Sequence, residues 1–126
     1  MAAALSHEQA YSVITNRLNT EHYAWGDGCD GWRLLNREDL SVTQERMPAG
    51  TSETRHYHHR ARQLFFVLDG RLEIELGGEV FALARTDALE VPPGQPHQVR
   101  NVSDAAAWFL VVSAPSTVRD RVNLEE

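Results

Sequence analysis

The spacing of apolar residues predicts one helix near the start of the chain. Residues 6–19 carry apolar side chains about 3.6 residues apart, the period of an amphipathic helix, at Tyr11, Ile14 and Leu18. Ser6 stands at the N-cap position and is followed by a glutamine in the position of a capping box. We expect a short N-terminal helix whose apolar stripe faces the body of the protein.

From residue 32 onward, short runs of branched and aromatic residues are separated by turn signals. The run 71–76 alternates strictly between polar and apolar residues, and Gly77-Gly78 after it suits a two-residue hairpin turn. Many short strands with turns at regular intervals predict an all-β sandwich or barrel. The strands are predicted near residues 32–36, 40–47, 55–59, 63–69, 71–76, 79–84, 87–91, 97–102 and 107–113.

The segment between the helix and the first predicted strand is rich in glycine and aspartate. Its glycines lie between Trp25 and Trp32, which indicates tight turns in a loop that packs on the protein. A length of 126 residues is ordinary for one domain, and no linker or repeat divides the chain. We expect a helix and loop in residues 1–31, a barrel in 32–115, and a polar tail in 116–126 that frays or packs on a partner.

The balance of charge is acidic, with 12 basic and 18 acidic residues and a formal net charge of −6. Proteins that bind nucleic acid by neutralising phosphates normally show the opposite balance, so no nucleic-acid partner is expected. No stretch reaches the roughly 20 apolar residues that cross a bilayer, and residues 1–9 lack the pattern of a signal peptide, so no membrane partner is expected. The single cysteine, Cys29, cannot form an internal disulfide, which agrees with a cytoplasmic location.

Three histidines and one glutamine are the main candidates for chemistry. His56 and His58 are two residues apart in a predicted strand, so both side chains leave the same face and can chelate one ion. Gln63 opens the next strand, and His97 opens a later one. Three neutral imidazoles and one amide oxygen suit Mn, Fe, Ni, Cu or Zn. A His-x-His pair also occurs on the surfaces of β proteins, so the pair by itself leaves both interpretations open.

The residues around these candidates resemble the two motifs of the cupin superfamily. The first motif is similar to Gly50-x5-His56-x-His58-x4-Gln63-x6-Gly70, and the second to Pro92-x-Gly94-x2-His97-x3-Asn101. The resemblance implies a small single-domain cupin with a double-stranded β-helix, or jelly-roll, barrel. It also implies a divalent transition metal ion inside the barrel, with His56, His58, Gln63 and His97 as its ligands.

Two positions depart from the usual cupin pattern. Thr86 replaces the glycine that commonly begins the second motif, a change that affects a turn. Gln63 stands where many cupins have a glutamate ligand, although some metal-binding cupins also carry glutamine there. Because an amide is neutral, the site has one negative charge fewer, and a bound ion attracts anionic substrates more strongly. In the other interpretation, Gln63 only hydrogen-bonds beside a three-histidine site.

Three further residues are candidates for the wall of the pocket. Phe65 and Val67 share the face of Gln63 by alternation, so they line the cavity or pack in the core. Arg46 shares a face with Val42 on an earlier strand. If that face points inward, Arg46 holds a substrate carboxylate through a bidentate pair; otherwise it is a solvated surface residue.

The cupin resemblance leaves the reaction open, because one fold hosts many activities. One hypothesis is a metal-dependent enzyme that isomerises or oxygenates a small oxygenated metabolite, such as a sugar, a keto or hydroxy acid, or an aromatic compound. The other is a non-catalytic module that binds or senses a small molecule, such as a sugar, and retains the metal. An acid or base beside an open metal position would favour proton-transfer catalysis over simple binding. Conversion of unsaturated uronates is disfavoured. The similar cupins that convert these compounds use a carboxylate on the last strand, whereas residues 108–113 of this chain contain none.

The strand near residues 63–69 is apolar on both faces, which predicts a homodimer. Leu64, Phe66 and Leu68 point outward by alternation, and an exposed apolar patch of this kind usually marks an interface. The resemblance to small cupins also implies a homodimer, because small cupins often form dimers. The N-terminal helix is the alternative cover for this patch, through Tyr11, Ile14 and Leu18.

Overall fold

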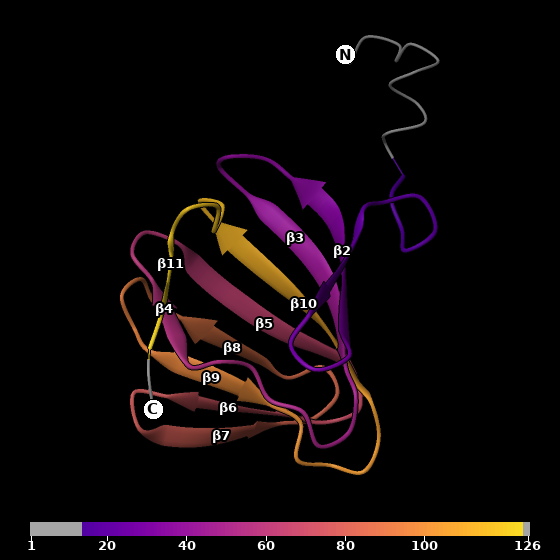
Figure 1. The fold of residues 1–126 in the computed structure, drawn as a ribbon, viewed down its shortest axis with the longest axis vertical. Coiled ribbons are helices and arrows are strands. Elements are labelled where there is room, and N and C mark those ends of the chain that lie inside the picture. Colours follow the sequence, from indigo (N-terminus) through magenta and orange to yellow (C-terminus); the bar gives the residue numbers. More distant parts are fainter. Residues whose placement is uncertain (1–13, 125–126) are drawn as a thin grey trace, which may run out of the picture.

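Two antiparallel sheets face each other in the structure, a computed structural model that describes residues 14–124 (Figure 1). The six-stranded sheet has the order β1-β2-β3-β10-β5-β8, and the five-stranded sheet has the order β11-β4-β9-β6-β7. The chain crosses repeatedly from one sheet to the other, which is the jelly-roll arrangement of a double-stranded β-helix. The strands are β1 (His22–Trp25), β2 (Cys29–Asn36), β3 (Ser41–Met47), β4 (His56–His58), β5 (Arg62–Asp69), β6 (Leu72–Leu76), β7 (Glu79–Leu83), β8 (Ala88–Val91), β9 (His97–Arg100), β10 (Ala107–Ala114) and β11 (Arg121–Asn123).

The apolar core lies between the two sheets and follows from the alternation along each strand. On β10, for example, Phe109 is fully buried and its neighbours in sequence are partly exposed. Burial of an apolar side chain of this size contributes about 1.5–3 kcal/mol relative to an exposed one. The largest fully buried apolar side chains are Phe109, Met47, Leu72 and Ile74.

Toward one end of the barrel, the inward positions change from apolar to polar. β3, β10 and β5 are neighbours, and each carries a polar inward residue there. Ser113 of β10 is paired with Ser41 of β3 on one side and with Gln63 of β5 on the other. All three side chains line one cavity. The same alternation that builds the core therefore places polar groups at its open end.

All nine strands predicted from the sequence are present, as β2 to β10. Two more strands were not predicted. β1 pairs with β2 in the segment expected to be a loop, so that Trp25 lies opposite Cys29. β11 pairs with β4 in the tail, and the buried Asp120 just before it binds the turn between β4 and β5. Residues 121–123 of the tail therefore do not fray but pair with the barrel of their own chain.

The structure describes only the last part of the predicted N-terminal helix, residues 14–19, and this part is not helical. Residues 6–13 lie outside the described residues, and residues 14–19 form bends and turns. The backbone nitrogen of Leu18 donates to Asn16 Oδ1 over 2.8 Å, a local bond of the kind that competes with helix formation. Ile14 and Leu18 are 72% and 94% exposed, so they do not face the body of the protein. Among the described residues, no helix is long and apolar enough to span a membrane.

Two turns bear out the sequence analysis. Gly77 and Gly78 both have positive φ, at 58° and 94°, and join β6 to β7 as the predicted hairpin turn. Thr86 also has a positive φ, at 70°, a conformation that strains a β-branched residue. The replacement of glycine by Thr86 therefore does affect a turn.

Candidate metal centre

Three histidines from the five-stranded sheet converge at the inner end of the cavity. His56 and His58 lie on β4 and point inward, because residues two apart share a face of the strand. His97 is the first residue of β9 and is paired directly with His56. All three side chains are buried, and their potential ligand atoms lie within 4.8 Å of one another. The structure thus brings together the three histidines that the sequence singled out.

Backbone carbonyls fix the orientation of two of the rings. His56 Nδ1 lies 2.8 Å from the carbonyl oxygen of Thr54, and His97 Nδ1 lies 3.0 Å from that of Gln95. A ring that donates from Nδ1 keeps its lone pair on Nε2, which is how histidine ligands are usually held toward a metal. His97 Nε2 is buried and has no hydrogen-bond partner among the described residues.

Gln63 approaches from the opposite sheet, on β5. Its amide nitrogen donates to Ser113 Oγ over 3.1 Å. Its Oε1 atom is buried and has no hydrogen-bond partner in the described part of the chain. An unpaired buried polar atom costs about 1–3 kcal/mol, and Gln63 Oε1 and His97 Nε2 are both unpaired, as is His58 Nδ1.

The histidines are neutral at physiological pH. Burial first, and then the neighbouring His97, lower the pKa of His56 to about 3 and that of His58 to about 4. Burial also lowers the pKa of His97. Neutral imidazoles offer lone pairs, and a set of three imidazoles with one amide oxygen suits a divalent transition metal ion. The unpaired atoms and the donor types therefore both fit such an ion.

The other predicted pocket residues lie in different places. Phe65 lines the cavity and its ring lies 6.1 Å from that of His97. Val67 is fully buried in the core and not in the cavity wall. Arg46 lies on the outer face of β3, where its Nη1 is 3.4 Å from Asp30 Oδ2. The expectation that Arg46 lines the pocket is therefore wrong, because the other face of β3 points inward.

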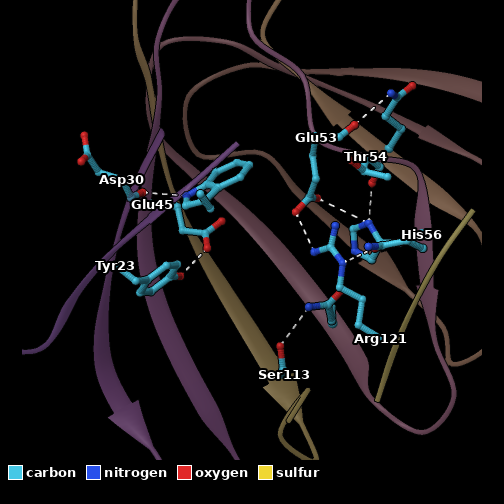
Figure 2. Close-up of polar contacts among 12 residues, drawn as sticks. Tyr23, Asp30, Glu45, Glu53, Thr54, His56, Ser113 and Arg121 are labelled. Carbon is cyan, nitrogen blue, oxygen red and sulfur yellow. Dashed lines mark hydrogen bonds and ion pairs between the residues drawn. The ribbon is translucent and has the colours of Figure 1, made fainter. Parts of the chain in front are cut away.

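Five charged or ionisable residues that the sequence analysis missed also line the cavity: Tyr23, Arg33, Glu45, Glu53 and Arg121. Glu53 Oε1 is 3.7 Å from His56 Nδ1, and Glu53 Oε2 is 3.0 Å from Arg121 Nη1. On the other side, the Tyr23 hydroxyl donates a hydrogen bond to Glu45. Figure 2 shows Tyr23 and Glu45 on one side, and Glu53, Arg121 and His56 on the other.

One signal for these residues was present in the sequence. Ser41, Thr43, Glu45 and Met47 alternate along β3, and Met47 is fully buried. Placing Met47 inward would have placed Glu45 inward too. Arg121 gave no such signal, because the tail pattern does not predict a strand.

The cavity enclosed by these residues has a volume of about 210 Å³. Sites for drug-sized ligands are typically about 300–1,000 Å³, so this cavity suits a small metabolite or one end of a larger one. Its wall combines carboxylates, arginines, a phenol and three of the candidate metal ligands, His56, His58 and Gln63. This combination can bind oxygen-rich molecules and exchange protons with them.

Comparison with known proteins identifies the family. Residues 43–113, more than half of the chain, match the family model for the cupin domain. The chain belongs to the cupin family. Over 69 residues it is 38% identical to the polyketide synthase protein CurC of Streptomyces cyaneus, a match that covers 55% of this chain and 45% of CurC. It likewise spans 60% of the MJ1618 protein of Methanocaldococcus jannaschii, at 27% identity over 75 residues. The chain thus spans about half the length of these relatives.

Solved structures share the fold. The polyketide cyclase RemF of Streptomyces resistomycificus superposes with a TM-score of 0.77 at 17% identity, covering 90% of this chain and 85% of RemF. A sugar phosphate isomerase of the cupin superfamily from Silicibacter pomeroyi superposes with a TM-score of 0.70 at 25% identity, covering 82% of this chain and 76% of that one. These similarities confirm the double-stranded β-helix.

Proposed function

We propose that this cupin is a metal-dependent enzyme that acts on a small oxygenated metabolite. His56, His58, Gln63 and His97 would hold a divalent transition metal ion. The observation that carries the proposal is the pair of unpaired buried atoms, Gln63 Oε1 and His97 Nε2, which come from opposite sheets of one barrel. A metal ion would give both atoms a partner.

The donor set supports a strongly electrophilic ion. All four ligands are neutral, so a bound divalent ion would keep its full charge. Such an ion supplies Lewis-acid polarisation of a carbonyl or carboxylate oxygen. Mn, Fe, Ni, Cu and Zn all accept imidazole and oxygen ligands. A keto or hydroxy acid, or another oxygen-rich and anionic compound, is the ligand class that this arrangement favours.

Isomerisation is the reaction that the cavity favours over dioxygenation. Moving a hydrogen next to a carbonyl requires an acid or base beside the substrate, and Glu45 and Glu53 line the same cavity as His56, His58 and Gln63. The structurally similar cupin from Silicibacter pomeroyi is named a sugar phosphate isomerase, which supports this choice.

Metal reconstitution followed by substrate screening tests the proposal. The protein is loaded in turn with Mn, Fe(II), Ni, Cu and Zn, and hydroxy ketones, aldoses, keto acids and uronates are followed by proton NMR. We expect conversion of at least one compound by the loaded protein and none by the metal-free protein. Binding of these compounds without conversion by any loaded form would instead favour a non-catalytic binding module.

A further inference from the structure

Tyr23, Gly31 and Glu45 occupy one row across three neighbouring strands. Tyr23 of β1 is paired with Gly31 of β2, and Gly31 is paired with Glu45 of β3. A side chain on the middle strand would normally separate the outer two. Gly31 has none, and a Cβ atom built there would overlap the Tyr23 ring. The phenol therefore reaches across β2 and donates its hydrogen bond to Glu45 Oε2.

This row faces two of the candidate metal ligands, His56 and His58, across the cavity. Tyr23 and Glu45 come from the six-stranded sheet, whereas His56 and His58 come from the five-stranded sheet, and all four line the same cavity (Figure 2). The row does not supply any of the four candidate ligands. It provides a carboxyl group on the sheet opposite His56 and His58, in a cavity of about 210 Å³.

The charged groups around Glu45 leave its carboxyl able to take up and release a proton. Burial raises the pKa of Glu45 to about 8, and the nearby Glu53 raises it as well. The hydrogen bond from Tyr23 and the positive charges of Arg121 and Arg33 act in the opposite direction. Burial and Glu45 raise the pKa of Tyr23, so the phenol stays protonated and serves as a donor.

We propose that Glu45 is the catalytic residue that carries a proton to and from the carbon next to the carbonyl of a hydroxy ketone or hydroxy aldehyde, and that Tyr23 positions it. The inference rests on the proposed function, because the substrate carbonyl must lie toward His56 and His58. The carboxylate of Glu45 takes the proton as the C–H bond breaks. The electron pair of that bond forms a C=C bond, and the carbonyl π pair moves to oxygen. The proton of the adjacent hydroxyl group then passes to that oxygen, and the electron pair of the broken O–H bond forms the new carbonyl. The C=C pair takes the proton back from Glu45 at the former carbonyl carbon, which completes the isomerisation.

The ionisation of Glu45 is measured first, on metal-free protein. Infrared difference spectra of wild type against Glu45→Gln are titrated through neutral pH, and the carbonyl stretch of a protonated carboxylic acid is followed. We expect a band in the wild type that Glu45→Gln lacks and that persists well above the usual glutamate range near pH 4.3. If the difference shows no protonated acid near pH 7, the proposal is overturned, whether or not the protein binds metal.

Proton transfer is measured next, on metal-loaded protein. Dihydroxyacetone and glyceraldehyde are incubated in D2O, and exchange of the hydrogen next to the carbonyl is followed by NMR. Glu45→Gln is expected to slow exchange by about 100-fold or more with unchanged metal content, whereas Glu79→Gln on the exposed strand β7 is expected to match wild type. Exchange by Glu45→Gln at the wild-type rate, or none by wild type that holds metal, would overturn this inference. Wild type that holds no metal would instead contradict the proposed function, and the infrared titration would still decide the state of Glu45.

The positioning role of Tyr23 has its own readout. Tyr23→Phe removes the hydrogen bond to Glu45, and Gly31→Ala displaces the ring from its place over β2. Because that hydrogen bond lowers the pKa of Glu45, both variants are expected to move the infrared titration midpoint of Glu45 to higher pH. A change in thermal stability without a change in midpoint would show that Tyr23 is only structural and would overturn this role.

Discussion

The side-chain amide of Gln63 donates to Ser113 Oγ over 3.1 Å, between residues paired directly across β5 and β10. The bond uses the nitrogen of the amide and so leaves Oε1 unpaired in the buried interior. An amide turned the other way would leave its NH2 group free instead, and an NH2 group has no lone pair to offer a cation. By accepting from the amide nitrogen, the Ser113 hydroxyl holds Gln63 in an orientation that leaves Oε1 free to act as a ligand.

Replacing Ser113 with alanine is expected to weaken metal binding. Loss of a group that orients a metal ligand typically lowers affinity by about 10–100-fold. The change is measured by competition with a chelator of known affinity. Ser41→Ala is the matched control, because Ser41 lies opposite Ser113 on β3 and lines the same cavity. Equal affinities for the two variants would show that Ser113 does not orient Gln63.

Replacing Gln63 with glutamate is expected to keep the metal and weaken its binding of anions. The substitution adds one negative charge to the ligand set and so lowers the attraction of the ion for an anion. With cobalt-loaded protein, azide titration followed by visible absorption measures this attraction. An azide affinity equal to that of wild type would indicate that Gln63 does not coordinate the ion.

The sequence predicted the cluster of His56, His58 and His97 better than it predicted the rest of the cavity, for a physical reason. The histidines and Gln63 lie in strands whose alternation is clear, and their spacing within the strands decides which face they share. The contact of Tyr23 with Glu45 depends on the pairing of β1 with β2 and on the absence of a side chain at Gly31. Such pairing is a long-range property, which a local pattern does not contain.

The misplacement of Arg46 has a related cause. If the inward face of a strand is assigned one residue out of step, every side chain along the strand is placed on the wrong face. On β3, the choice that brought Arg46 inward turned Glu45 outward. Most positions of this strand are partly buried, and neither face is clearly apolar or clearly charged. The alternation therefore did not show which face points inward.

Asp120 is expected to stabilise the fold through the C-terminal strand. Its carboxylate accepts hydrogen bonds from the backbone nitrogens of Ala61, at 2.8 Å, and Arg60, at 3.0 Å. Asp120→Asn places an NH2 group against these donors and is expected to lower the free energy of unfolding by about 1–3 kcal/mol. Urea unfolding measures the change, with Asp104→Asn in an exposed loop as the control. A loss no greater than that of the control would contradict this role.

The contribution of Asp120 is also expected to depend on pH. Burial raises the pKa of Asp120, but the hydrogen bonds from Ala61 and Arg60 outweigh burial and hold the pKa below its usual value. A carboxyl group with a lowered pKa in the folded state stabilises the protein above its unfolded pKa, near 3.9. That stability is lost as the pH falls through the lower, folded pKa. The difference in unfolding free energy between wild type and Asp120→Asn should therefore shrink in acid, and a constant difference would contradict the assignment.

The outer face of the six-stranded sheet is expected to form a homodimer interface. Leu110 and Phe66 are paired on this face, and Leu64 nearby is 39% exposed. Ile14 and Leu18, which belong to the alternative cover for this face, are themselves exposed. An isologous contact between two copies is the commonest way to bury such a patch.

Light scattering at micromolar concentration tests the dimer. We expect a mass near twice the 14.2 kDa of one chain. Leu110→Arg is expected to reduce the mass to that of one chain, whereas Val102→Arg, at an exposed apolar residue outside the sheets, should not. A wild-type mass near 14.2 kDa would reject the dimer.

Metal content per chain tests the central claim most directly. Wild type, His56→Ala/His58→Ala and the control His22→Ala/His59→Ala are loaded with the same divalent ion, desalted and measured by elemental analysis. The control removes two imidazoles from exposed positions, so it separates the site from histidine binding in general. We predict about one ion per chain for wild type and the control, and almost none for His56→Ala/His58→Ala. A full equivalent of metal in His56→Ala/His58→Ala, or none in wild type, would contradict the proposed metal centre.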